Sequence, residues 1–271
     1  MSKHPSRRAV LVAAAAVLAV GRPGQAAAVS SSRTLVAAGD MNSGAETDAT
    51  GRLAQRQQPD LVATLGDHQY PVATLDALKN GYATTAWDGL RAKDHPVPGH
   101  HEYDDPGAKG YFAFFGKPPW YAYDIGLGWR GYALNSLVPL ANQLAWLRSD
   151  LAAHRGASVV ATWADPRWSS GVKHDNDPAV QPLLDAFTGH SGVVLNGHEH
   201  NYERFAPVAG LRQFVVGTGG SSSYPFGAPV AGSQFRLTGV PGVLVLRLLS
   251  AGHYTWRFLD VAGAARDSGS G

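Results

Sequence analysis

Histidine, aspartate and tyrosine side chains that could hold metal ions lie in four short clusters. The clusters are Gly39-Asp40, Gly66-Asp67-His68-Gln69-Tyr70, Gly99-His100-His101-Glu102 and Gly197-His198-Glu199-His200. Their carboxylate, imidazole and phenol groups suit hard or borderline cations such as iron, manganese or zinc. A single Gly-Asp pair is typical of an ordinary turn, because glycine tolerates positive φ and aspartate caps the backbone that follows. The ordered set is far more specific, and it predicts a metal site.

Short runs of strand type precede these clusters, at residues 34–38, 61–65, 94–98 and 192–195. A further run, 158–163, leads into Ala164-Asp165-Pro166. In open α/β sheets the functional residues gather at the carboxyl ends of the strands. The clusters therefore stand where such a sheet places its chemistry.

Helical patterns lie between these strands, at residues 46–57, 140–153 and 179–187. The second pattern has one apolar stripe, as an amphipathic helix should; it consists of Leu140, Leu144, Leu147 and Leu151. Strands that alternate with helices predict a layered α/β fold. Residues 205–261 predict strands and turns, with a closing hairpin of 242–249 and 253–259, and we expect residues 262–271 to be a flexible tail.

The composition predicts one large globular domain. The chain has 271 residues, of which 44% are hydrophobic and 16% charged, so it can bury a sizeable core. It contains no cysteine, which excludes disulfides, thiolate metal ligands and a cysteine nucleophile.

The first 28 residues predict an export signal. Lys3, Arg7 and Arg8 precede an apolar run at 9–20, and three alanines at 26–28 offer a cleavage site. The pair Arg7-Arg8 also resembles a twin-arginine signal, so both export routes stay open. This segment holds four of the 23 basic residues and none of the 21 acidic ones. The mature chain is therefore slightly acidic, which argues against nucleic acid as a partner, and no membrane span is expected in it.

The ordered clusters, with Tyr70 three residues after Asp67, resemble the signature of the calcineurin-like metallophosphoesterase superfamily. The longer run Gly197-His198-Glu199-His200-Asn201-Tyr202-Glu203-Arg204 is similar to that of its purple acid phosphatase branch. The resemblance covers about residues 33–220. It implies a four-layer α/β/β/α sandwich, which we expect to form one catalytic domain at 29–261.

The resemblance also implies a role for each matching residue. Asp40, Tyr70 and His200 would hold the first metal, with iron favoured by the phenolate, and Asp67 would bridge to the second. His101 would act as a catalytic donor or general acid, and Glu102 would orient its imidazole. His198 would ligate a second divalent metal, which could be iron, manganese or zinc.

The second metal site departs from the family pattern at two positions. His100 stands where the family has asparagine, and Ala164 stands where it has a histidine ligand. Either the site has decayed, or His68 and His100 rebuild it. Asp165 and His174 are further candidate ligands, although an extended backbone would point Asp165 away from the direction of Ala164.

The resemblance implies a hydrolase that acts on a small phosphate ester outside the cytoplasm. Two alternatives remain open: a non-hydrolytic iron enzyme with redox or rearrangement chemistry, and a silent binding homologue.

Overall fold

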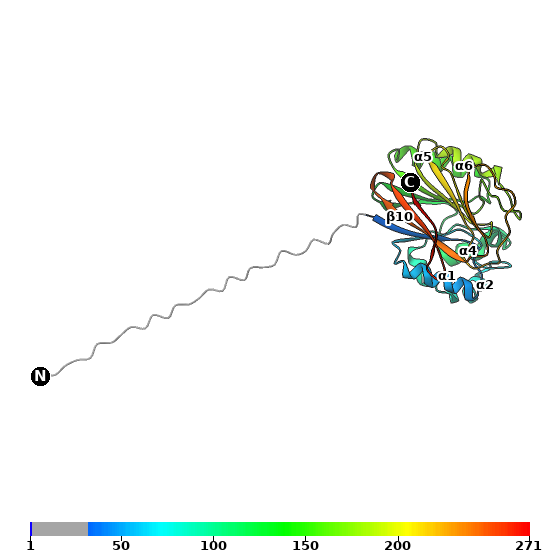
Figure 1. Cartoon of the computed structure of the whole chain (residues 1–271), viewed down its shortest axis with the longest axis horizontal. Helices are drawn as coiled ribbons and strands as arrows, with labels where there is room; N and C mark the ends of the chain where they lie inside the picture. Colours follow the sequence, from blue (N-terminus) through cyan, green and yellow to red (C-terminus); the bar gives the residue numbers. More distant parts are fainter. Residues whose placement is uncertain (2–31) are drawn as a thin grey trace. The chain divides into compact units, whose positions relative to one another are not determined.

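The computed structural model describes Met1 and residues 32–271, so the predicted export signal at 1–28 lies outside the described residues except for Met1. Two β-sheets form the centre of the fold (Figure 1). The first has the order β12-β11-β10-β1-β2, where β1 is Ser32–Ala38, β2 Leu61–Thr64, β10 Gly242–Leu249, β11 Tyr254–Asp260 and β12 Ala265–Ser270. Strands β1 and β2 run parallel, and β10 runs antiparallel to β1.

The second sheet has seven strands in the order β3-β4-β5-β6-β8-β7-β9. Their bounds are Tyr121–Gly126 (β3), Trp129–Ala133 (β4), Ser158–Thr162 (β5), Gly192–Asn196 (β6), Tyr202–Phe205 (β7), Leu211–Val216 (β8) and Ser233–Leu237 (β9). Strands β4, β5, β6 and β8 are parallel to their neighbours in this series. Such strands are largely buried on both faces, which explains the apolar runs of β5 and β6.

Helices cover the outer face of each sheet (Figure 1). Residues of α1 (Ala45–Arg56), α2 (Leu75–Asn80) and α4 (Lys109–Phe115) pack on the first sheet. Residues of α5 (Leu140–Ala153) and α6 (Gln181–Ala186) pack on the second. The remaining short helices are α3 (His100–Tyr103), η1 (Tyr82–Thr84), η2 (Asp88–Lys93), η3 (Pro106–Ala108), η4 (Pro178–Val180) and η5 (Ser250–Gly252).

Alternating side chains of β1 divide the core into layers. Leu35 and Ala37 belong to the apolar cluster between the two sheets, whereas Val36 and Ala38 pack with the helices on the outer face. A third cluster joins the second sheet to α5 and α6. The structure is therefore the predicted four-layer α/β/β/α sandwich.

The sequence patterns predicted α1, α5, α6 and strands β1, β2, β5, β6, β10 and β11 near these places, but not α2, α4, β3 or β4, and two expectations were wrong. Residues 94–98 form only isolated bridges to the end of β2, because the Asp94 carboxylate accepts hydrogen bonds from the N–H and hydroxyl of Thr64. Residues 262–271, expected to be a flexible tail, instead contain β12, which pairs with β11.

The Asp267 carboxylate holds β12 in place. It accepts hydrogen bonds from the Tyr202 hydroxyl (2.8 Å), Arg204 Nε (2.8 Å) and Trp256 Nε1 (3.1 Å). These contacts tie the last strand to both sheets.

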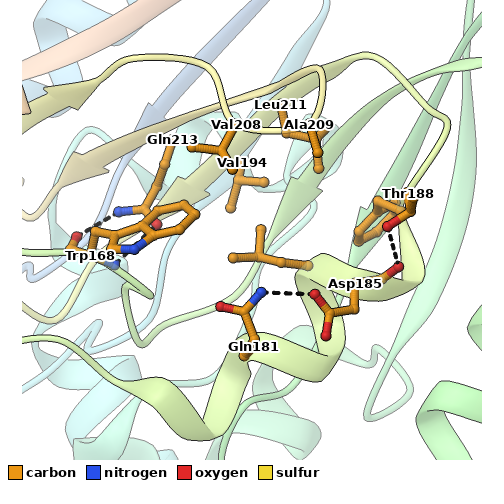
Figure 2. Close-up of a pocket in the computed structure, with 11 residues that line it drawn as sticks. Trp168, Gln181, Asp185, Thr188, Val194, Val208, Ala209, Leu211 and Gln213 are labelled. Carbon is orange, nitrogen blue, oxygen red and sulfur yellow. Dashed lines mark hydrogen bonds between the residues drawn. The ribbon is translucent and has the colours of Figure 1, made fainter. Parts of the chain in front are cut away.

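A cavity of about 80 Å³ lies beneath α6 (Figure 2). Leu184, Phe187 and Val194 make much of its lining apolar, while the Gln213 amide donates to the Trp168 carbonyl (2.6 Å). The cavity lining contains no histidine. Among the described residues, no helix is long and apolar enough to cross a membrane.

Candidate metal centre

Three candidate ligands stand on unusual backbone at the ends of buried strands. Asp40 follows β1, Asp67 follows β2 and His198 follows β6, and their φ angles are 58°, 52° and 69°. Hydrogen bonds connect the three turns: Met41 N–H donates to the Asp67 carbonyl (2.8 Å), and His198 N–H donates to Asp40 Oδ2 (2.8 Å). The two sheets thus place these side chains at one common edge.

The first group of donors consists of Asp40, Tyr70 and His200. The Tyr70 hydroxyl lies 3.3 Å from Asp40 Oδ1 and 3.0 Å from His200 Nε2, and these last two atoms are 3.3 Å apart. Ligands that each lie about 2.0–2.2 Å from one ion stand roughly 3 Å from each other. The three atoms therefore fit the inner coordination sphere of one cation, as the sequence predicts.

The ring of His200 is oriented for this purpose. Its Nδ1 lies 2.6 Å from the Ser222 carbonyl, so a proton on Nδ1 donates there and leaves Nε2 free as a ligand atom. Tyr224 stacks on the same ring, with centroids 4.0 Å apart. The sequence patterns did not identify Tyr224, which lies in a Gly- and Ser-rich loop without a motif.

The phenol of Tyr70 keeps its proton in the absence of a cation. Burial, and then the carboxylates of Asp40 and Asp67, raise its pKa far above the ordinary value. A cation bound by the Tyr70 oxygen would replace this proton and would be attracted by the same two carboxylates.

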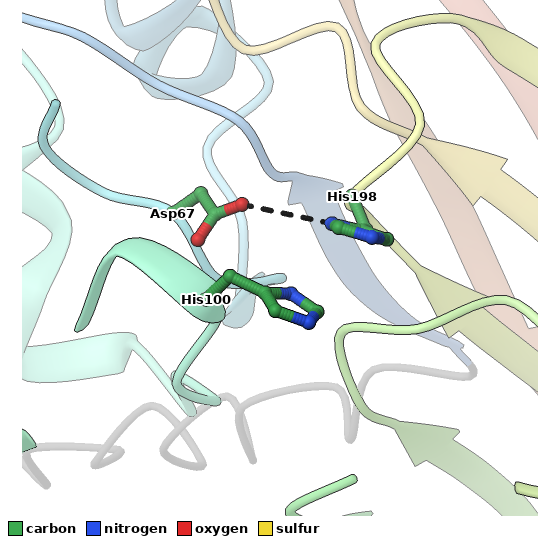
Figure 3. A group of neighbouring side chains, drawn as sticks. All are labelled: Asp67, His100 and His198. Carbon is green, nitrogen blue, oxygen red and sulfur yellow. Dashed lines mark ion pairs between the residues drawn. The ribbon is translucent and has the colours of Figure 1, made fainter. Parts of the chain in front are cut away.

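The second group of donors consists of Asp67, His100 and His198, whose ligand atoms all lie within 4.8 Å of one another (Figure 3). Asp67 Oδ2 is 4.0 Å from His198 Nδ1. The imidazoles of His100 and His198 are stacked, with centroids 4.2 Å apart. This group brings His100 together with two residues that the resemblance assigns to the second metal.

Electrostatics connect Asp67 and His198. Burial raises the pKa of Asp67, but His198 and the N–H of His101 outweigh burial and hold that pKa below its usual range. Burial lowers the pKa of His198, but the carboxylates of Asp67, Asp165 and Asp40 outweigh it and raise that pKa. A cation placed here would be attracted by the same carboxylates that raise the pKa of His198.

Asp165 points towards this second group, contrary to the direction expected for an extended chain. Its Oδ1 lies 3.6 Å from His100 Nδ1 and 3.7 Å from His198 Nε2. Strand β5 ends at Thr162 and the backbone bends at 164–165, so the alternation of a strand no longer applies.

His101 lies at the exposed side of the first group, beside Tyr70, with ring centroids 4.2 Å apart. Its Nδ1 is 2.6 Å from the Pro71 carbonyl and 3.2 Å from Asp104 Oδ2. These contacts orient the imidazole through Nδ1, and with the Nδ1 proton donated to the Pro71 carbonyl, Nε2 is a donor only in the imidazolium form. Its catalytic role stays a prediction.

Glu102 does not orient His101, which corrects the expectation from the resemblance. Its buried carboxylate accepts hydrogen bonds from the N–H groups of Gly99 (2.6 Å), Asp67 (2.8 Å) and His68 (2.8 Å). Glu102 therefore fixes the loop that carries Asp67.

His68 lies beneath the metal centre and not in it. Both ring nitrogens have partners, Nδ1 with Glu102 Oε1 (3.2 Å) and Nε2 with the Thr64 hydroxyl (2.8 Å), and the side chain is fully buried. It packs among Tyr82, Tyr111 and Phe115. The interpretation of His68 as an additional ligand is wrong in this structure.

His174 lies over the second group, with its ring centroid 3.9 Å from that of His198. The Glu199 carboxylate accepts hydrogen bonds from the N–H groups of Lys173 (3.2 Å) and His174 (3.1 Å) and so holds this loop. Burial and the neighbouring His198, His200 and His100 lower the pKa of His174 to about 4. The ring is thus neutral near pH 7, and a ligand role for it stays a prediction.

The fold is shared with phosphatases of known structure. The purple acid phosphatase PPD1 from yellow lupin (Lupinus luteus) seeds superposes with a TM-score of 0.71 at 19% identity, over 89% of this chain and 54% of that one. The present chain thus spans about half the length of the lupin enzyme. A dimetal phosphatase from Danio rerio gives a TM-score of 0.59 at 12% identity, over 88% of this chain and 98% of that one.

A protein described as an anchor is equally similar. GAP50, the anchor in the inner membrane complex of Plasmodium, superposes with a TM-score of 0.71 at 13% identity, over 89% of this chain and 88% of that one. No curated protein matches the sequence significantly. The family model of the calcineurin-like phosphoesterases matches residues 34–202, which is more than half of the sequence. The chain therefore belongs to the calcineurin-like phosphoesterase family.

Proposed function

We propose that this chain is an exported, metal-dependent hydrolase of small phosphate esters. The observation that carries the proposal is the pair of adjacent donor groups, Asp40/Tyr70/His200 and Asp67/His100/His198, in a calcineurin-like phosphoesterase fold. Two cations held in such groups would neutralise phosphoryl oxygens and lower the pKa of water. The lupin and zebrafish neighbours, both phosphatases by description, support the same reaction class.

The residues of the two donor groups and His101 have different roles in the proposed reaction. Asp40 and His200 hold the first position, and Asp67, which is ion-paired with His198 and acts electrostatically on Tyr70, is suited to connect both positions. His101, with Nδ1 fixed on the Pro71 carbonyl, would in its imidazolium form present Nε2 as a hydrogen-bond donor or general acid towards the substrate.

We further propose iron at the first position and a divalent iron, manganese or zinc at the second. The phenol of Tyr70, which lies 3.3 Å from Asp40 Oδ1 and 3.0 Å from His200 Nε2, supports trivalent iron, because a phenolate is a hard anionic ligand. Iron-loaded protein should show a tyrosinate absorption band, and Tyr70→Phe should abolish it without unfolding the protein. Bound iron with no such band would contradict ligation by Tyr70.

Hydrolysis of p-nitrophenyl phosphate by protein loaded with iron, manganese or zinc tests the reaction. Asp67→Asn should lower turnover at least about 100-fold, because it removes the carboxylate shared by both positions. The matched control is Asp76→Asn, an exposed aspartate in the first turn of α2, which should leave turnover unchanged. Bound metal with no turnover of any phosphate ester would instead support the non-hydrolytic alternative.

Export is a separate proposal that rests on the sequence of residues 1–28. N-terminal sequencing of the secreted protein should find a start near Val29. Recovery of the intact Met1 end from a cytoplasmic protein would contradict it.

A further inference from the structure

The carboxylate of Asp165 is buried, and its charged neighbours are two imidazoles. The residue is only 5% exposed, and among residues 32–271 its side-chain oxygens accept no hydrogen bond. Its nearest polar neighbours are two imidazole nitrogens, at 3.6 Å and 3.7 Å. A carboxylate removed from water is costly unless it is paired, hydrogen-bonded or bound to a metal. The spacing of these donor atoms would also suit a cation bound by Asp165 and the two rings.

The bend that aims Asp165 at this place is fixed by backbone contacts. Asn196 Nδ2 donates to the carbonyls of Trp163 (2.9 Å) and Asp165 (3.3 Å), and the N–H of Gly197 donates to the Ala164 carbonyl (3.1 Å). Pro166 also restricts the conformation of Asp165, since the residue before a proline avoids the helical region. The direction of the side chain is thus built into the loop.

His100 completes the arrangement from the opposite side. It begins α3, stacks on His198 and faces Asp165 with Nδ1. The side chain of Ala164 carries no donor, so the donors on the loop after β5 are Asp165 and, further along, His174, whose ring lies over that of His198. A carboxylate from one residue further on and an imidazole from α3 together provide donors where Ala164 provides none.

We infer that the second cation is held by Asp67, His100, His198 and Asp165, with Asp165 as the fourth ligand. In this structure Asp67 faces Nδ1 of His198 (4.0 Å) and Asp165 faces Nε2 (3.7 Å), so the His198 ring must turn for one of its nitrogens to share an ion with both carboxylates. The inference rests on the proposed two-metal function and specifies the composition of its second site. Two carboxylates and two neutral imidazoles balance a divalent charge. Such a mixed oxygen and nitrogen set suits zinc, manganese or ferrous iron better than calcium or magnesium, which prefer oxygen ligands.

Zinc titration of the metal-free protein, followed by calorimetry and by metal analysis, tests this composition without any activity assay. The wild type should bind two zinc ions. Asp165→Asn should weaken only one of them, at least about tenfold, as loss of a close ligand contact does. Asp76→Asn removes the same charge at a distance and should change neither ion.

His100→Ala is the second variant, and it guards against misfolding of the first. The His100 side chain is 45% exposed, so its removal should leave the fold intact while it weakens the same ion. His154→Ala, which removes a similarly exposed imidazole at the end of α5, is its control. Two zinc ions bound with unchanged affinity by both Asp165→Asn and His100→Ala would overturn the inference.

Moving the ligand by one residue sharpens the test. The double variant Ala164→His with Asp165→Ala should bind the second ion more tightly than Asp165→Ala alone, because it returns a donor to this loop. The double variant His100→Asn with Ala164→His restores the family ligand set and should raise phosphatase turnover if the proposed function holds. If the wild type binds two metal ions as expected but hydrolyses no phosphate ester, the proposed function is refuted and the ligand assignment stands. Normal turnover with an unaffected Asp165→Asn titration would refute the assignment alone.

Discussion

Replacement of Glu102 by glutamine is the sharpest test of how the metal centre is held together. The carboxylate accepts three backbone N–H groups, with Oε2 taking those of Gly99 and Asp67 and Oε1 taking that of His68. Glutamine has the same shape but only one acceptor oxygen. Its amide nitrogen must therefore face at least one of these buried donors.

The magnitude follows from the best orientation of the amide. With its oxygen at the position of Oε2, the bonds to Gly99 and Asp67 persist without charge assistance, which costs about 1 kcal/mol each. The N–H of His68 then loses its partner, which costs about 1–3 kcal/mol more. We expect Glu102→Gln to lower the free energy of unfolding by about 3–5 kcal/mol and to weaken cation binding at Asp67.

Denaturant unfolding of the metal-free protein measures this change. Glu46→Gln is the control, since Glu46 is exposed in the first turn of α1 and its charge there is worth about 0.5 kcal/mol. A loss below about 1 kcal/mol for Glu102→Gln would refute the hydrogen-bond argument. It would also reopen the role that the resemblance implies for Glu102, the orientation of His101.

Three further predictions follow from residues around the centre. Burial and Lys117 lower the pKa of His95 to about 4, so the unfolded chain binds this proton more tightly than the folded one, and the free energy of unfolding should fall by up to about 3 kcal/mol between about pH 6.5 and pH 4. In His95→Phe, whose ring keeps the stacking on Tyr123, unfolding measured against pH should lose this part of the pH dependence. Asp267→Ala should lower the free energy of unfolding by about 3–5 kcal/mol, because it removes the carboxylate that accepts from Arg204, Tyr202 and Trp256. A loss similar to that of exposed Asp76→Ala would show that β12 contributes little to the stability of the fold. Gly99→Ala should cost about 1–3 kcal/mol and weaken metal binding, since a Cβ would lie within van der Waals overlap of Asp67 Oδ1, and unchanged zinc affinity would contradict this.

The strands and helices around the centre could be predicted because their patterns are strong. Strands β1, β2, β5 and β6 are buried on both faces and read as continuous apolar runs. Helix α5 kept its stripe only in part: Leu147 and Leu151 are buried, but so is Gln143, whose amide bonds to the backbone of Asn135. Polar burial of this kind has no signature in hydrophobic periodicity.

The last strand could not be predicted, for a different physical reason. Residues of β12 are almost all exposed and polar, and a sequence such as Ala265-Arg266-Asp267-Ser268 has low strand propensity. The strand forms because it pairs with the free edge of β11 and because Asp267 accepts a hydrogen bond from the buried Tyr202 hydroxyl. Both are tertiary contacts, which overrule local propensity.

The candidate ligands could be predicted from the residue types, but the directions of their side chains could not. His68 and Tyr70 are both close to Asp67 in sequence, yet only Tyr70 reaches the first group while His68 turns inward to Glu102 and Thr64. Asp165 turns towards His198 because the chain bends directly after β5. Each outcome depends on the turn that follows a strand, and these turns depend on hydrogen bonds from distant residues.

Left-handed backbone at three candidate ligands indicates that the turns are held against a local preference. Asp40, Asp67 and His198 have positive φ, which costs a side chain-bearing residue about 1–2 kcal/mol. The surroundings oppose relaxation: the Glu102 carboxylate holds Asp67, Asp40 Oδ2 holds the N–H of His198, and Gly217 packs against that same oxygen with no room for a Cβ. A residue pattern such as Gly-Asp is compatible with an ordinary turn, so it does not reveal this strain. The fold retains this backbone strain where the carboxylates and imidazoles of the two donor groups meet. The strain lowers stability, so its position supports the view that these turns were selected for cation binding.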